Sequence, residues 1–222
     1  MAWWTEKKID YYNRAARFTD FHRILASEIE KHISKDESII EYGAGLGYVT
    51  EILRNDGYNI RAIEMDGNAI RSANERVGYE LVEKGDAYGD IEKSDVILMC
   101  FFGRLAEDDN LDHFLEKTKK IVNISGRHKG YSLSHRKDHT GDLPKLLEER
   151  KIPFEVTELE AEFNQPFADV EEAREWFKLT YGRDGDIDVV ESGIEEFPLT
   201  FVNRKRTVIT VINTEKGEDN EE

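Results

Sequence analysis

The chain has 222 residues, of which 39% are hydrophobic, and this composition suits one domain with a sizeable core. Its formal net charge of −16 would repel phosphate backbones, which argues against a DNA or RNA substrate. The single cysteine, Cys100, excludes an internal disulfide, and we find neither a signal peptide nor an apolar stretch long enough to span a membrane, so we expect a cytoplasmic protein without a membrane partner.

Apolar side chains at helical spacing predict one or two helices over residues 6–33, ahead of the first strand. From there, short apolar runs alternate with amphipathic segments. Strands are predicted at 38–42, 58–65, 79–87, 95–102 and 120–126, and helices at 48–57, 68–78 and 109–120. This order predicts right-handed crossovers and a mostly parallel sheet covered by helices, an α/β fold.

The last third of the chain has a different pattern. Residues 142–150 and 169–182 are predicted to be helices, with an extended segment at 154–163 between them. Residues 197–213 contain two alternating apolar patterns around a short turn, which predicts a C-terminal antiparallel hairpin attached to the sheet. Residues 214–222 are mostly acidic and are predicted to form a disordered tail.

The turn after the first predicted strand, EYGAGLGY at 41–48, has the composition of a nucleotide-cofactor site. Glycines in a strand-to-helix turn let the backbone approach a ligand and leave helix N–H groups free for its polar atoms. The dinucleotide fingerprint G-x-G-x-x-G would require Gly or Ala where Tyr48 stands. Glu41 is unusual in an apolar strand, because a buried carboxylate needs a partner, and a ligand ammonium would supply one.

This turn resembles the first motif of the class I S-adenosylmethionine-dependent methyltransferases, which is an acid, any residue, and then G-x-G-x-G. EYGAGLG matches the motif throughout, and the resemblance covers roughly residues 35–213. It implies a Rossmann-like, doubly wound, mostly parallel seven-stranded sheet with an antiparallel last strand. It also implies S-adenosylmethionine as the cofactor and methyl transfer as the activity. Residues 1–34 are then a helical lid or cap in front of the methyltransferase domain.

The resemblance also implies which residues bind the cofactor. Glu64, at the end of the second strand, corresponds to the acid that binds the ribose, and Asp86 and Ala87 correspond to the pair that reads the adenine edge. The end of the fourth strand corresponds to the segment that borders the sulfonium. The full expected set is Glu41, Gly43, Ala44, Gly45, Gly47, Tyr48, Glu64, Met65, Asp86, Ala87, Cys100 and Phe101.

We expect the acceptor to bind among the loops at the carboxyl ends of the strands. The expected substrate-binding residues are Tyr12, Phe102, Arg104 and Arg127. His128 is the candidate general base, although a solvated loop histidine fits the same pattern. His135, Asp138 and His139 could suggest a metal site, but their basic neighbours and the lack of a further ligand cluster predict no bound metal.

The aromatic residues near the start form either a lid over the substrate or a helix packed by its aromatics into the core. They are Trp3, Trp4, Tyr11 and Tyr12. We expect a methyltransferase that acts on an O, N or C atom of a small molecule, and a homodimer is compatible with the sequence. Methylation of a protein or an RNA, and a cofactor-binding module without catalysis, remain alternatives. A nicotinamide dehydrogenase is disfavoured by Glu41 and Tyr48.

Overall fold

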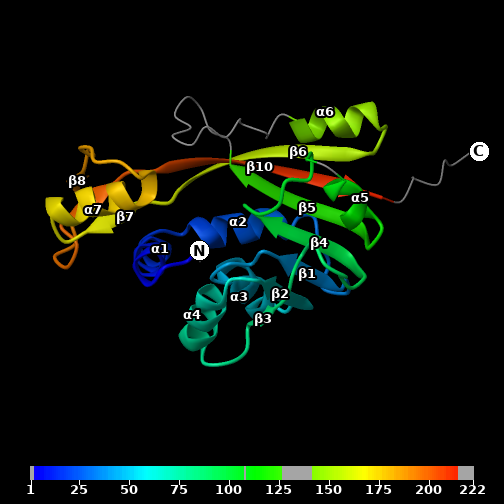
Figure 1. Cartoon of the computed structure of the whole chain (residues 1–222), viewed down its shortest axis with the longest axis horizontal. Coiled ribbons are helices and arrows are strands. Elements are labelled where there is room, and N and C mark those ends of the chain that lie inside the picture. The colour runs from blue at the N-terminus through cyan, green and yellow to red at the C-terminus, as the bar shows by residue number, and fades with distance from the viewer. Residues whose placement is uncertain (1–2, 108, 127–141, 215–222) are drawn as a thin grey trace, which may run out of the picture.

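The computed structural model describes residues 3–107, 109–126 and 142–214, and within these ranges one large mixed sheet dominates (Figure 1). Its strands are β1 (Ile39–Tyr42), β2 (Ile60–Glu64), β3 (Val82–Lys84), β4 (Ser94–Cys100), β5 (Thr118–Gly126), β6 (Phe154–Glu162) and β10 (Arg204–Asn213). They lie in the order β3-β2-β1-β4-β5-β10-β6, and β10 runs antiparallel to both of its neighbours. The expected Rossmann-like, mostly parallel sheet is therefore confirmed.

The centre of the sheet is formed by β1 and β4, because β1 pairs in parallel with both β2 and β4. The apolar run predicted at 95–102 supplies β4, and residues 96–99 have no exposed surface. Such a run is typical of a strand that is covered on both faces. Burying one large apolar side chain contributes about 1.5–3 kcal/mol, so β4 is a strong anchor for the loop that follows it.

Helices cover both faces of this sheet. Those that do are α2 (Phe21–Ile29), α3 (Tyr48–Asn55), α4 (Gly67–Val77), α5 (Asn110–Leu115) and α6 (Asp142–Glu149). Two further helices, α1 (Glu6–Phe18) and α7 (Val170–Tyr181), both contact the short strand at Gln165–Phe167. Phe21 and Leu53 bury α2 and α3 against one face, and Phe114 and Leu147 bury α5 and α6 against the other. Figure 1 shows α6 above the sheet and α3 and α4 below it. None of these described helices has both the length and the apolar character that crossing a membrane requires.

Local sequence explains where the two helices next to the glycine turn begin. Gly47 precedes α3 in the left-handed conformation, with a φ of 70°, which glycine adopts without steric cost. Asp66 caps α4, because its side chain accepts hydrogen bonds from the backbone N–H groups of Asn68 and Ala69. Gly78 ends α4, again in the left-handed conformation. Both helices therefore start at the carboxyl edge of the sheet, where their N-termini meet.

A second, small antiparallel sheet lies at one end of the molecule, to the left in Figure 1. Its strands are β7 (Gln165–Phe167), β8 (Val190–Glu191) and β9 (Leu199–Phe201), in the order β7-β9-β8. Tyr11 of α1, Phe167 of β7 and Ala173 of α7 are buried together in the core of this unit. The N-terminal helix is therefore bound to the last third of the chain.

Two features of the predicted order need correction. The antiparallel ending is confirmed, but β10 pairs with β6 and not with β9, which joins the small sheet. The physical reason is length, because β6 offers β10 a ladder of nine residue pairs, whereas β9 has three residues. The helix predicted at 109–120 ends at Leu115, because Thr118 already pairs with Ser94 at the start of β5.

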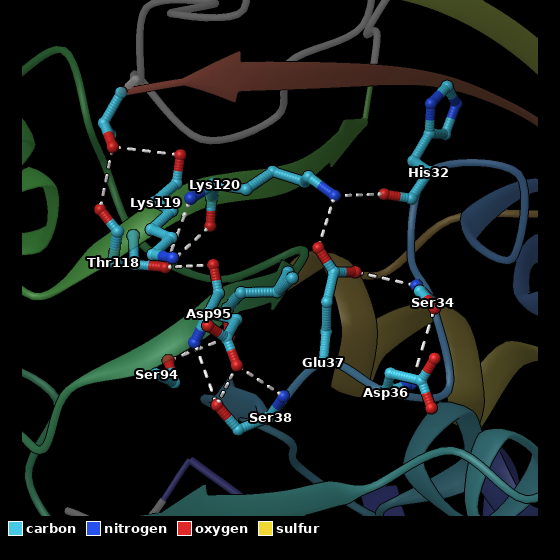
Figure 2. A network of polar contacts seen from close by, with 12 residues as sticks. His32, Ser34, Asp36, Glu37, Ser38, Ser94, Asp95, Thr118, Lys119 and Lys120 are labelled. Carbon is cyan, nitrogen blue, oxygen red and sulfur yellow. Dashed lines mark hydrogen bonds and ion pairs between the residues drawn. The ribbon is translucent and has the colours of Figure 1, made fainter.

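A polar network ties together the amino ends of β1, β4 and β5 (Figure 2). Ser38 donates from its backbone N–H and from its hydroxyl to Asp95, at 2.9 and 2.6 Å, and these bonds hold the pKa of Asp95 below its usual range. The hydroxyl of Thr118 donates to the carbonyl of Asp95 at 2.9 Å, and Lys120 pairs with Glu37 at 2.8 Å. The network closes the edge of the sheet opposite the glycine turn.

Candidate cofactor and substrate site

A cavity of about 880 Å³ opens at the carboxyl ends of β1, β2 and β4. This volume is typical of a ligand pocket that holds a drug-sized or nucleotide-sized molecule. It is lined by Trp3, Trp4, Tyr12, His22, Leu25, Glu41, Gly43, Ala44, Gly45, Leu46, Gly47, Tyr48, Val49, Glu64, Met65, Asp66, Gly67, Asn68, Cys100, Phe101, Phe102 and Lys205. The glycine turn, the ends of β2 and β4, the first two helices and β10 therefore all meet in one site.

The three glycines of the turn all have left-handed backbone angles, and their surroundings differ. A Cβ at Gly43 would overlap the ring of Phe102, at 2.1 Å from Cγ, and a Cβ at Gly47 would lie 2.9 Å from Leu81. At Gly45 the nearest atom to a Cβ would be 3.4 Å away, in the ring of Trp4. Two glycines thus permit packing, while Gly45 presents bare backbone to the cavity.

Glu41 is a buried carboxylate at the floor of the cavity, with 1% of its surface exposed. It accepts hydrogen bonds from the hydroxyl of Thr50 and the thiol of Cys100. The pKa of Glu41 is raised to about 7, mainly by burial and in addition by the charge of Glu64, with the two hydrogen bonds acting in the opposite direction. In the described part of the chain Glu41 forms no ion pair, so a cation is the partner that its charged form lacks.

Glu64 ends β2 with its carboxylate held in a fixed orientation. It accepts hydrogen bonds from the backbone N–H groups of Gly45 and Met65, each at 2.8 Å, and from that of Asp66 at 2.9 Å. Each carboxylate oxygen has more than one acceptor site, so these bonds leave acceptor capacity for a ligand hydroxyl. The glycine turn and the end of β2 are thereby locked together.

The N-terminal aromatic residues were expected to form either a lid over the substrate or part of the core. Some of them line the cavity, and one is buried in the core. The backbone N–H of Trp4 donates to Asp66 at 3.1 Å, and the amide of Asn68 donates to the carbonyl of Trp4 at 2.8 Å. Trp4 also packs edge-on against Tyr12, with ring centroids 5.4 Å apart, and both line the cavity. Tyr11, in contrast, is buried in the core of the small-sheet unit. Trp4 and Tyr12 therefore line the cavity, while Tyr11 packs in the core.

Most of the expected site residues lie in the cavity wall. Those that do are Tyr12, Glu41, Gly43, Ala44, Gly45, Gly47, Tyr48, Glu64, Met65, Cys100, Phe101 and Phe102. Asp86 accepts from the backbone N–H of Tyr88 in its own loop, Ala87 is buried in the core, and neither lines the cavity. Arg104 points to an ion pair with Glu107 and is likewise outside the lining.

Several other predictions lie outside the described residues. These are the roles of Arg127 and His128 and the histidine cluster at 135–139. Among the residues that are described, no three His, Cys, Asp or Glu side chains are placed to share a metal ion.

Sequence reasoning missed four polar lining residues: His22, Asp66, Asn68 and Lys205. For Lys205 a signal was present in the run Arg204–Lys205–Arg206, because side chains alternate between the faces of a strand. Arg204 and Arg206 are exposed, and Lys205 shares its face with the buried residues Thr207 and Ile209. A lysine in phase with core positions indicates a functional role. No comparable signal identifies the other three.

No protein-family model matches the chain, and no curated protein sequence matches it. Solved structures do. The YcgJ protein of Bacillus subtilis superposes with a TM-score of 0.54 at 12% identity, over 88% of this chain and 98% of that protein. A predicted methyltransferase of Bacillus halodurans gives 0.52 at 12% identity, over 86% and 99%. The precorrin-6y C5,15-methyltransferase of Geobacter metallireducens gives 0.50 at 14% identity, over 87% and 86%.

The fold and the comparisons together define the class of structure. The sheet order, the antiparallel β10 and the glycine turn after β1 are those of the class I, Rossmann-like methyltransferase fold, and the neighbours named as methyltransferases share it. At identities this low the likeness concerns the fold alone, and function has to be argued from the site.

Proposed function

We propose that the protein is an S-adenosylmethionine-dependent methyltransferase that acts on an O, N or C atom of a small molecule. The observation that carries this proposal is the Glu41 carboxylate, which is buried without a cation directly below the glycine turn. The ammonium group of S-adenosylmethionine would complete that partnership. Glu64, already oriented by three backbone N–H groups, would accept from the ribose hydroxyls.

When bound, S-adenosylmethionine would supply a methyl group on a positively charged sulfur. The residues of this chain would then have to hold the two reactants in line and exclude water. Gly45 lets the backbone approach the cofactor, while the rings of Trp4, Tyr12 and Phe101 wall the cavity. Orientation of this kind contributes about 7–11 kcal/mol to lowering a barrier, so methyl transfer does not depend on a conspicuous acid or base.

Two features support a small acceptor. Trp4 is held by hydrogen bonds with Asp66 and Asn68, and its ring narrows the cavity beside Gly45. The net charge of −16 opposes an RNA acceptor, because a phosphate backbone would be repelled over most of the surface.

Turnover tests the proposal directly. We expect the protein, incubated with S-adenosylmethionine and a metabolite extract, to form S-adenosylhomocysteine and a new species heavier than its precursor by one methylene group. The Glu41→Gln variant serves as the control and should form less of both when S-adenosylmethionine is kept below the dissociation constant of the variant. Binding of the cofactor without product from any extract would instead indicate a module without catalysis. Product formed only from added protein or RNA would replace the small-molecule acceptor.

A further inference from the structure

Lys205 enters the cavity from β10, and its immediate surroundings are aromatic. Its Nζ lies 4.3 Å from the ring centroid of Phe163, 5.2 Å from that of Phe21 and 5.4 Å from that of Phe101. A ring face attracts a cation, which holds the ammonium between the three rings. Rings do not neutralise the charge, so the lysine still lacks an anion.

Two carboxylates on the neighbouring strand β6 already pair with arginines of β10. Arg204 pairs with Glu162 at 3.5 Å, and Arg206 pairs with Glu160 at 2.8 Å, both between β10 and β6. Because side chains alternate along a strand, these pairs lie on the face opposite to Lys205. Within the described ranges the side-chain ammonium of Lys205 forms neither an ion pair nor a hydrogen bond. Burial lowers the pKa of Lys205 to about 8, so the group remains mostly protonated at neutral pH.

The three rings around Lys205, those of Phe21, Phe101 and Phe163, adjoin the expected cofactor position through two consecutive residues. Cys100 donates to Glu41, and Phe101, next in the chain, stacks on Phe21 beside Lys205. Phe101 has a φ of 56°, a left-handed conformation that a residue with a side chain rarely adopts. Its backbone N–H is held by the carbonyl of Ile124 at 2.8 Å. Strain of this kind persists where packing enforces it and often marks a functional site.

A second polar group in the same wall also lacks a partner. His22 is 6% exposed, and its Nε2 shares a hydrogen bond of 2.8 Å with the hydroxyl of Tyr12. Its Nδ1 has no hydrogen-bond partner among the described residues. Burial, followed by the charges of Lys205 and Arg76, lowers the pKa of His22 to about 3, so the ring is neutral. A neutral ring whose Nε2 accepts from Tyr12 carries its proton on Nδ1, and that proton has no acceptor among the described residues.

Resting on the proposed function, we infer that the methyl acceptor is a flat carboxylic acid, and that Lys205 binds its carboxylate. The rings of Phe101 and Tyr12, which line the cavity, suit an aromatic or similarly flat body. The ammonium of Lys205 supplies a charge-assisted hydrogen bond to the carboxylate. In a chain of net charge −16, such a local cation selects anionic acceptors that the remaining surface repels.

The test compares benzoate with benzamide, two probes of equal shape and different charge, by calorimetry on protein saturated with S-adenosylhomocysteine. We expect the native protein to bind benzoate about tenfold or more tightly than benzamide, the difference expected of a hydrogen bond to a charged group. Lys205→Met should remove this preference, while Lys205→Arg should keep it. Arg206→Met, on the same strand but facing outward, is the matched control and should behave as the native protein does.

Equal affinity for the two probes, binding of neither, or an unchanged preference in Lys205→Met would overturn the inference. If the Met variant does not fold, Lys205→Gln replaces it, because glutamine retains a polar head without the charge. Each protein is first titrated with S-adenosylhomocysteine alone. If S-adenosylhomocysteine does not bind, that result counts against the proposed function. Benzoate and benzamide are then compared on the free protein, and their relative affinities still test the role of Lys205.

Discussion

Replacing Glu41 by glutamine is expected to weaken S-adenosylmethionine binding at least about tenfold and, at the same time, to stabilise the free protein. Affinity should fall because glutamine cannot pair with the ligand ammonium as a carboxylate does. Stability should rise because burial raises the pKa of Glu41 from 4.5 to about 7 in the folded chain. The folded state therefore resists the ionisation that the unfolded chain undergoes freely.

The direction of the pKa shift determines the pH range over which Glu41 destabilises the folded protein. Below pH 4.5 both states keep the proton and Glu41 carries no penalty, whereas between pH 4.5 and about 7 the unfolded chain ionises first. Above about 7 the penalty is complete, on the order of 3 kcal/mol from about 1.4 kcal/mol for each unit of pKa. Denaturant unfolding should show Glu41→Gln more stable than the native protein near pH 8, with a difference that shrinks toward pH 5.

The same titration should appear in cofactor binding. A cation favours the ionised carboxylate, so protons compete with the cofactor, and the affinity of the native protein should drop about tenfold between roughly pH 7 and pH 5.5. The Glu41→Gln variant should not show this dependence. Glu75→Gln, at an exposed position of α4, is the matched control and should change neither stability nor affinity. Equal affinities in Glu41→Gln and the native protein across this range would refute the assigned role.

Replacing Gly45 by valine should have the second large effect, a loss of cofactor affinity of about a hundredfold or more, or about 3 kcal/mol. The valine side chain would occupy the space between the glycine turn and Trp4. The left-handed φ of 56° adds a backbone cost of about 1–2 kcal/mol, which would also lower the melting temperature.

The Gly78→Val variant separates the effect of the occupied cavity space from the backbone cost of a left-handed residue. Gly78 also has a left-handed φ, of 80°, but no atom lies within 4 Å of its would-be Cβ, and it is outside the cavity. Its valine variant should lose comparable stability while binding S-adenosylhomocysteine with native affinity in calorimetry. If both variants keep native affinity, or if both lose it in parallel with stability, the glycine turn is not the cofactor cradle.

How far sequence alone could predict this molecule depended on the range of the interactions involved. The strand, the turn with Glu41 and its three glycines, and the helix after it were readable because all of their determinants lie within 39–55. The buried run of β4 was equally local. Strand pairing is not local, which is why the partner of β10 was misassigned: both candidate segments alternate, and only the length of the ladder distinguishes them.

The same limit applies to predicting the residues that line the cavity. The half around the glycine turn lies within residues 41–68 and at the end of β4, and most of its members were among the expected cofactor-binding residues, Gly45 and Glu64 for example. The other half combines Trp4, His22 and Lys205, which are brought together by the packing of α1, α2 and β10. Nothing in the local pattern around His22 indicates that it faces a lysine from the far end of the chain. Asp86 matched a motif by position, yet its loop lies outside the cavity wall.

Titrating the native protein with S-adenosylhomocysteine and, separately, with NADH shows whether the glycine turn with Glu41 and Glu64 binds S-adenosylmethionine. We expect a dissociation constant for S-adenosylhomocysteine near about 1 μM, a binding free energy of about −8 kcal/mol, with NADH weaker by about a hundredfold or more. The opposite result, tight NADH binding with no heat from S-adenosylhomocysteine up to about 1 mM, would contradict it.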